Sequence, residues 1–131
     1  MQELIEEFIN RRVWAVVGAS QNPAKYGYKI VQDLTAAGYK VYPVNPKGGE
    51  IEGIQVYRSL RELPEKPEVV DIVVPPQVTE EVVKECRELG LTRIWMQPGA
   101  ESEAAIRYCE ENGMQVVYGV CAMLNKKRWE E

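Results

Sequence analysis

One short segment of the chain combines residue types that bind phosphate. Residues 18–20 read Gly-Ala-Ser after an apolar run, so a glycine permits a tight turn and the Ser20 hydroxyl can donate to a phosphate oxygen. Lys25 and Tyr26 follow at the expected start of a helix, where backbone N–H groups and the helix dipole favour a negative group. The segment therefore predicts a phosphate-binding loop. The other explanation is that Ser20 and Asn22 only cap the helix.

A second segment, Asn45-Pro46-Lys47, distinguishes between kinds of nucleotide site. An NAD site has an acidic residue about 20 residues after its glycine loop, where it accepts a hydrogen bond from the ribose. Here the second apolar run is followed by Lys47 instead of a carboxylate. A cation at this place suits a phosphorylated ribose, which occurs in both NADP and coenzyme A. A solvated loop lysine is the alternative. A Walker A motif is absent from the sequence.

The periodicity of the chain predicts the elements that must position these residues. Apolar runs at 13–18, 40–46, 69–76, 93–99 and 114–120 predict five strands. Helical patterns precede or separate them at 1–12, 26–37, 78–89 and 102–113. We expect a polar loop at 47–53, at most a short helix within 57–68, and a C-terminal tail at 122–131.

This alternation of strands and helices predicts the fold class. It is typical of an α/β protein, here a single Rossmann-like three-layer domain over residues 1–131 with a five-stranded, mainly parallel sheet. In such sheets ligands bind beyond the carboxyl ends of the strands. Glycine, proline and small polar residues gather at all five of these ends, which predicts a shared cleft. Termination of the strands is the simpler explanation of each glycine or proline taken alone.

Composition excludes several classes of protein. The net charge of -4 argues against a nucleic-acid-binding protein, which usually has a basic excess. Apolar runs stay shorter than the roughly 18 residues that span a bilayer, and the N-terminus does not resemble a secretory signal. Cys86, Cys109 and Cys121 cannot all pair within one chain, so we expect reduced thiols in the cytoplasm.

Several motifs in order give the chain a family resemblance. Over residues 10–121 it resembles the CoA-binding protein family, small stand-alone domains related to the N-terminal CoA-binding domain of the succinyl-CoA synthetase alpha subunit. The resemblance is carried by VVGASQNPAKYGYKI, GYKVYPVNPKGGEIEGIQVYRSL, VDIVVPP and IWMQPGA. It implies coenzyme A lying extended across the strand ends, with Lys47 near a CoA phosphate and Gln97 near an amide or the adenine. With the residues above, the candidate binding set is Gly18, Ala19, Ser20, Lys25, Tyr26, Asn45, Pro46, Lys47, Val74, Pro75, Met96, Gln97 and Pro98.

One departure from the synthetase limits the expected activity. That enzyme works through a phosphorylated histidine in a second domain, whereas these 131 residues contain no histidine and have no room for a second domain. We therefore expect a carrier, sensor or partner subunit that binds CoA or an acyl-CoA without catalysis and without a metal. Cys121 is the one attractive nucleophile near the strand ends, although cysteines at such places are often small buried residues.

Two other functions remain open from the sequence. The first is an NADP-dependent oxidoreductase using the same phosphate loop, which the absence of a Tyr-x-x-x-Lys pair disfavours. The second is a structural or interaction protein with a vestigial cleft, in which Trp129 and the N-terminal helix form a dimer surface. Among partners we expect a small-molecule ligand, a homodimer or an unknown partner enzyme, and neither nucleic acid nor membrane.

Overall fold

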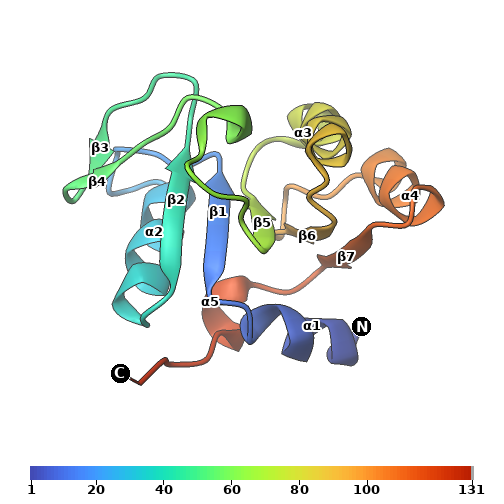
Figure 1. Ribbon diagram of the computed structural model, residues 1–131, viewed down its shortest axis with the longest axis horizontal. Coiled ribbons are helices and arrows are strands. Elements are labelled where there is room, and N and C mark those ends of the chain that lie inside the picture. Colours follow the sequence, from blue (N-terminus) through green and yellow to red (C-terminus); the bar gives the residue numbers. More distant parts are fainter. Residues whose placement is uncertain (131) are drawn as a thin grey trace.

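Five strands form the middle layer of the protein in this computed structural model, which describes residues 1–130 (Figure 1). They are β1 (Val13–Val17), β2 (Lys40–Val44), β5 (Val69–Ile72), β6 (Arg93–Met96) and β7 (Gln115–Tyr118). Their order across the sheet is β2-β1-β5-β6-β7, and every neighbouring pair is parallel. The predicted Rossmann-like α/β fold is confirmed. The five-stranded sheet, expected to be mainly parallel, is parallel throughout.

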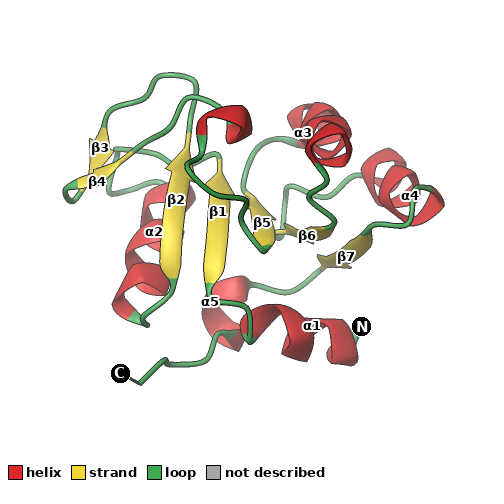
Figure 2. Cartoon of the chain, in the orientation of Figure 1, coloured by secondary structure: helices red, strands yellow, loops and turns green. Residues whose placement is uncertain are grey.

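Helices cover both faces of this sheet (Figures 1 and 2). One face is covered by α1 (Gln2–Ile9), α2 (Tyr26–Ala36) and the short α5 (Ala122–Asn125). The other is covered by α3 (Pro76–Leu89) and α4 (Glu103–Glu111). A single 3-10 turn, η1 (Leu60–Glu62), is the short helix expected between 57 and 68.

The two faces have cores of different composition because successive residues of a strand point to opposite sides. On the α1 and α2 side, Phe8, Trp14 and Trp95 are buried together, with ring centroids 5.7 Å apart for the two tryptophans. On the α3 and α4 side the buried residues are mainly aliphatic, such as Val83 and Ile94. We call these the aromatic face and the aliphatic face.

A small hairpin was not expected from the sequence. The glycine-rich loop predicted at 47–53 contains β3 (Glu50–Ile51) and the turn that follows it. This strand pairs in an antiparallel ladder with β4 (Ile54–Gln55), just beyond the loop. Glu52 and Gly53 turn the chain with φ of 49° and 83°, as the two central residues of a tight hairpin turn often do. Strands of two residues are too short to give the alternating pattern by which strands are recognised.

Strand and helix boundaries also differ where prolines occur. The strand expected to continue to residue 76 ends at Ile72, and the second proline of the pair is instead the first residue of α3. Proline suits this position because the first helical N–H has no partner within the helix. Pro43 lies inside β2, which is tolerated because β2 is at the edge of the five-stranded sheet.

Both ends of the chain pack on the domain itself. Ile5 and Phe8 of α1 are buried in the aromatic face. Past α5, the Trp129 ring lies edge-on to Tyr39, and its backbone N–H donates to Ala37 at 2.9 Å. These contacts favour packing of Trp129 within its own chain over the dimer surface considered above.

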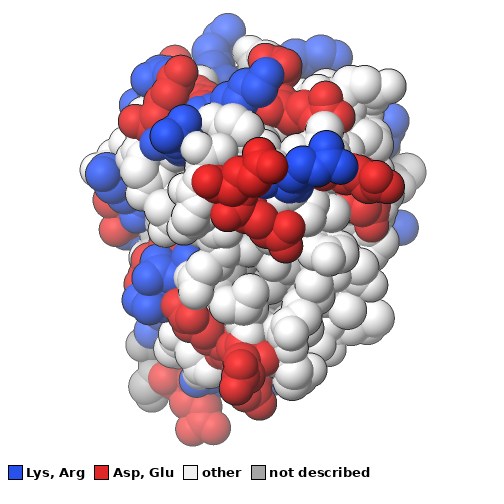
Figure 3. Space-filling view, turned by 90° about the vertical axis from the view of Figure 1, so that its right-hand side faces the viewer, with Lys and Arg blue, Asp and Glu red and all other residues white. Residues whose placement is uncertain are grey.

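The surface carries charges of both signs. Seen from the side on which α4 and β7 lie, acidic and basic side chains alternate next to a broad uncharged area (Figure 3). No continuous basic strip crosses this view, in keeping with the net charge of -4. Within residues 1–130, every helix is too short or too polar to cross a bilayer.

Candidate functional site

The loop after β1 is shaped by two glycines that allow close approach of the backbone. Gly18 has φ of 101°, and a Cβ there would lie 2.7 Å from the Val73 carbonyl oxygen at the end of β5. A Cβ on Gly27 in α2 would lie 2.2 Å from the Gly18 oxygen. Gly27 therefore allows the helix to pack closely on the loop, which is the role of the third glycine in the dinucleotide fingerprint G-x-G-x-x-G. Its position in the sequence does not match the spacing of that fingerprint.

Ser20 and Asn22 order this loop without capping the helix. The Ser20 hydroxyl accepts from the Asn22 N–H at 3.1 Å, and the Asn22 side-chain oxygen accepts from the Ala24 N–H at 3.0 Å. The α2 helix begins later, with Lys25 as its N-cap residue and no side-chain cap. The alternative that these two residues cap α2 is therefore wrong. The uncapped first turn of α2 can donate to an anion.

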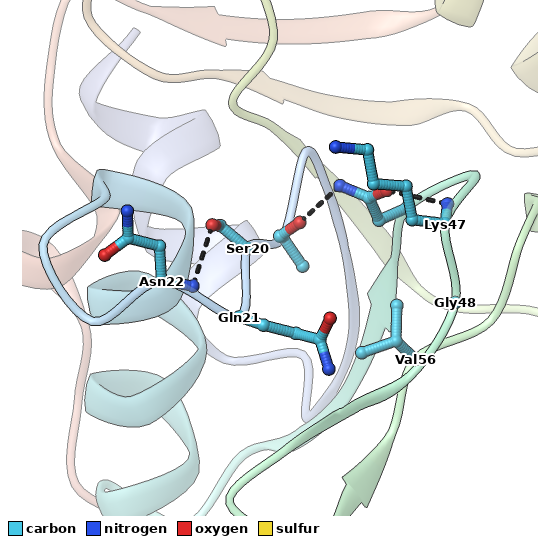
Figure 4. Close-up of a pocket in the computed structure, with 8 residues that line it drawn as sticks. Ser20, Gln21, Asn22, Lys47, Gly48 and Val56 are labelled. Atoms are coloured by element: carbon cyan, nitrogen blue, oxygen red, sulfur yellow. Dashed lines mark hydrogen bonds between the residues drawn. The ribbon is translucent and has the colours of Figure 1, made fainter.

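Asn45 joins the loop after β1 to the loop after β2. Its side-chain nitrogen donates to the Ala19 carbonyl at 2.7 Å, and its side-chain oxygen accepts from the Lys47 N–H at 2.8 Å. This bridge fixes the position from which the exposed Lys47 side chain extends. In Figure 4 that side chain leads away from Gly48 and Val56, toward the side on which Ser20 lies.

Three adjoining depressions follow the carboxyl ends of β2, β1, β5 and β6, and together we call them the strand-end cleft. The loop depression has a volume of about 230 Å³ and is lined by Ala19, Ser20, Gln21, Asn22, Asn45, Lys47, Gly48 and Val56. The central depression, of about 420 Å³, is lined by Gly18, Ala19, Ser20, Lys25, Tyr26, Gly27, Asn45, Lys47, Val73, Val74 and Pro75. The proline depression, of about 430 Å³, is lined by Tyr26, Val73, Val74, Pro75, Pro76, Pro98, Gly99 and Ala100.

The structure brings most of the predicted site residues to this cleft. Those that line it are Gly18, Ala19, Ser20, Lys25, Tyr26, Asn45, Lys47, Val74, Pro75 and Pro98. Pro46 is exposed outside the three depressions. Met96 and Gln97 are fully buried, with Met96 in the aliphatic core. The contact of these last three with a ligand remains a prediction, and no side chain among them lines a depression.

Gln97 instead belongs to a chain of buried polar groups beneath the cleft. Its amide nitrogen donates to both Asp71 carboxyl oxygens, at 2.8 and 3.0 Å. Its amide oxygen accepts from the Ala122 N–H at 3.2 Å and from the Tyr26 hydroxyl at 3.4 Å. The Tyr26 oxygen also lies 2.7 Å from the Cys121 Sγ. Hydrogen bonds thus connect the buried carboxyl group to a tyrosine that lines the cleft.

Burial changes the proton affinity of two members of this polar chain. Removal from water raises the pKa of Asp71 to about 8, against the opposing effect of the hydrogen bond from Gln97. Burial also raises the pKa of Tyr26, and the hydrogen bond with Cys121 adds to the rise. Both groups are therefore predominantly protonated at neutral pH. Cys121 is half-buried and free, whereas Cys86 and Cys109 are fully buried in the aliphatic face.

Several lining residues were not found from the sequence. Gln21 could have been included because it follows Ser20, and its amide donates to the Glu50 carbonyl at 3.0 Å, joining the loop to the hairpin. Val56 comes from a segment with no recognisable pattern. Arg58 is a second cation near Lys47: a Cβ on Gly48 would lie 3.3 Å from its Nε. Only the fold brings these residues together.

Metal-ligating groups do not gather here. Among residues 1–130 there is no group of three or more cysteine, aspartate or glutamate side chains able to hold a metal ion.

A family model and curated relatives match the chain. The model, described as a CoA binding domain, matches residues 12–127. The alpha subunit of acetate–CoA ligase [ADP-forming] I from Pyrococcus furiosus is 42% identical over 93 residues, which cover 66% of this chain and 20% of that subunit. The chain thus spans about a fifth of the length of the first curated relatives that it matches.

Solved structures match over most of the chain. A conserved hypothetical protein from Pyrococcus furiosus has a TM-score of 0.84 and 50% identity, covering 88% of this chain and 99% of that protein. Acetyl-coenzyme A synthetase 1 of Ca. Korarchaeum cryptofilum, in complex with phosphate and ADP, has a TM-score of 0.71 and 31% identity. That match covers 86% of this chain and 26% of the synthetase.

Proposed function

The chain belongs to the CoA-binding domain family, and from this premise we propose that it binds coenzyme A or an acyl-CoA in the strand-end cleft without catalysing a reaction itself. The observation that carries the proposal is the composition of the loop and central depressions. Ser20, Lys25 and Lys47 line them, and among residues 1–130 no carboxylate lines either depression. An anionic ligand is therefore favoured over a neutral or cationic one.

The extent of the cleft suits an extended ligand. Strands in a sheet are about 4.8 Å apart, so the ends of β2 and β6 are separated by roughly 14 Å. The adenosine would lie in the loop depression, with the ribose phosphate beside Lys47. The diphosphate would meet the loop after β1 and the uncapped first turn of α2. The pantetheine arm would then extend across the central depression toward β5 and β6.

The end of β2 supports a phosphorylated ribose over NAD. Asn45 uses both side-chain atoms within the protein, and the next polar side chain, Lys47, is a cation. The described residues that line the loop depression include no carboxylate, the group that would accept a hydrogen bond from the ribose of NAD. Arg58 behind Gly48 adds to the positive potential at this end.

The lining residues also support binding over catalysis. Hydroxyls, amides and ammonium groups surround the cleft, and the chain has no histidine to serve as a general base. Asp71, whose carboxyl group is linked to Tyr26 of the cleft through Gln97, is fully buried and hydrogen-bonded to Gln97. Such a site can hold and present a ligand to another protein, as a carrier, sensor or partner subunit.

Isothermal titration with coenzyme A, dephospho-CoA and NADPH tests the proposal. We expect coenzyme A to bind most tightly, and dephospho-CoA to bind more weakly because it lacks the ribose phosphate near Lys47. Equal affinity for the first two ligands would show that the ribose phosphate is not recognised.

Substitution of Lys47 provides the matched test. Lys47→Ala is expected to weaken coenzyme A binding by about 1–3 kcal/mol, the range for hydrogen bonds to charged groups, and to affect dephospho-CoA much less. Lys84→Ala is the control, since it removes the same charge from an exposed position on α3 beside Glu81. An unchanged affinity in Lys47→Ala would overturn the placement of the ribose phosphate.

NADP is the second candidate ligand, because Lys47 could equally neutralise its ribose phosphate. Binding of NADPH tighter than that of coenzyme A, with hydride transfer to a panel of carbonyl compounds, would establish this alternative.

A further inference from the structure

The far end of the strand-end cleft differs chemically from the end assigned to the ribose and phosphates. We propose that the proline depression holds the apolar acyl chain of an acyl-CoA, so that the natural ligand class is acyl thioesters and not free coenzyme A. The inference rests on the proposed function, since it needs the CoA portion in the central and loop depressions.

Backbone donors are scarce around the proline depression. Pro75, Pro76 and Pro98 have no N–H group. The Val73 N–H donates to the Val17 carbonyl at 2.8 Å, and the Ala100 N–H donates to the Gln97 carbonyl at 2.8 Å.

Two further polar groups of the lining are also engaged. The Gly99 N–H donates to a Glu101 carboxylate oxygen at 2.7 Å. Within the described part of the lining, Tyr26 provides the one polar side chain, and its hydroxyl already contacts Cys121 and Gln97. The two amides of a pantetheine arm would find few partners here, and burial of an amide without a hydrogen-bond partner is unfavourable. An alkyl chain needs no such partners.

The central depression offers the opposite environment. Ser20, Lys25, Asn45 and Lys47 line it, so the phosphates and the start of the pantetheine arm have polar partners there. Tyr26, Val73, Val74 and Pro75 line both depressions, which makes the two continuous. A thioester at this junction would leave its acyl group directed into the proline depression.

The volume and rigidity of the proline depression limit the acyl group. About 430 Å³ of open space accommodates a short or medium chain, and the ring of each proline fixes a backbone torsion of the wall. We expect affinity to rise with chain length while methylene groups are being buried, and then to level off.

Titration with a homologous series tests the inference. The ligands are coenzyme A, acetyl-CoA, butyryl-CoA and hexanoyl-CoA. Burial of one methylene group corresponds to about a fourfold gain in affinity, so hexanoyl-CoA should bind at least tenfold more tightly than acetyl-CoA. Equal affinity for coenzyme A and hexanoyl-CoA would overturn the inference and leave the proposed function standing. Failure of all four ligands to bind would overturn the proposed function itself.

Pro76 permits a variant that acts on the proline depression without a buried substitution. It is the first residue of α3 and partly exposed, so Pro76→Gln can fold while it places an amide in the wall. We expect this variant to lower the ratio of hexanoyl-CoA affinity to coenzyme A affinity by at least threefold. Pro76→Ala, which keeps the wall apolar, should lower the ratio less. An unchanged ratio in Pro76→Gln would contradict the placement of the acyl chain.

Discussion

The aromatic and aliphatic faces of the sheet are built from the same strands but differ in polarity. In the part of the chain that the structure describes, the aliphatic face behind α3 and α4 contains no buried acidic or amide side chain. Behind α1, α2 and α5, the tryptophans share their face with Asp71 and Gln97, both fully buried. Hydrogen bonds lead from this second pair to Tyr26 in the strand-end cleft.

This difference separates two roles of buried side chains. Apolar packing fills space on the aliphatic face and has few directional requirements. The polar chain on the aromatic face needs each member in one orientation, because a buried polar group without its partner is costly. We infer that the aliphatic face contributes mainly to the stability of the fold. The aromatic face also determines the position of Tyr26 in the wall of the strand-end cleft.

The largest expected effect comes from Asp71 on the aromatic face. Its pKa is about 8 in the folded protein against an ordinary value of 3.8, so between pH 4 and 8 the folded chain keeps a proton that the unfolded chain has lost. The free energy of unfolding should therefore fall as pH rises through this window, by the order of 5 kcal/mol. In Asp71→Asn this contribution is removed. Chemical denaturation of both proteins at pH 5, 7 and 9 measures the difference.

The comparison between these two proteins cancels the titration of all other groups. Asp71→Asn should gain stability relative to the original chain as pH rises. A difference that stays constant from pH 5 to 9 would show that the carboxyl group is not held protonated.

A substitution on the aliphatic face should have a different pattern. Ile94→Ala leaves a cavity between β6 and its covering helices, and should cost about 2–5 kcal/mol of unfolding free energy. Coenzyme A affinity should change less than twofold, because Ile94 lines no part of the cleft. Ile94→Val is a smaller truncation at the same position, with an expected cost of about 0.5–1.5 kcal/mol of unfolding free energy. If coenzyme A affinity fell in proportion to the unfolding free energy in these two variants, the proposed difference in role between the two faces would be wrong.

The smallest expected effect concerns Tyr26. Tyr26→Phe removes the hydroxyl shared by Gln97 and Cys121, and should cost about 1 kcal/mol of stability. It should also increase the rate at which Cys121 is alkylated by iodoacetamide, since the thiol loses its partner. Cys86 and Cys109 are internal controls, because burial raises the pKa of both thiols and blocks access. Alkylation of either in the folded protein would contradict this assignment.

The fold and the family were predictable from the sequence for physical reasons. Strands buried on both faces give continuous apolar runs, and glycine or proline follows most of them. The resemblance to the CoA-binding family is confirmed by the family model. Most candidate residues reach the cleft because the carboxyl ends of parallel strands lie at the same edge of the sheet.

The remaining parts depend on contacts that sequence patterns do not contain. Gln97 sits at a strand end like Pro98, and only the direction of its side chain places it inside, next to Asp71. The β3–β4 hairpin has strands of two residues, too short for a periodic pattern. Val56 and Arg58 follow this hairpin, which brings them to the region of the loop depression. Neither could therefore be predicted from the sequence to belong to the site.

The position of α1 has a consequence for the order of folding. This first helix packs beside β7, the last strand, and its Glu7 forms an ion pair of 3.1 Å with Arg93 of β6 (Figure 1). Residues about a hundred positions apart must therefore meet before this half of the sheet is shielded from water. Non-local pairing of this kind slows folding. During synthesis, α1 cannot complete its packing until nearly the whole chain has been made. Its apolar side therefore stays accessible to chaperones until β7 has been synthesised.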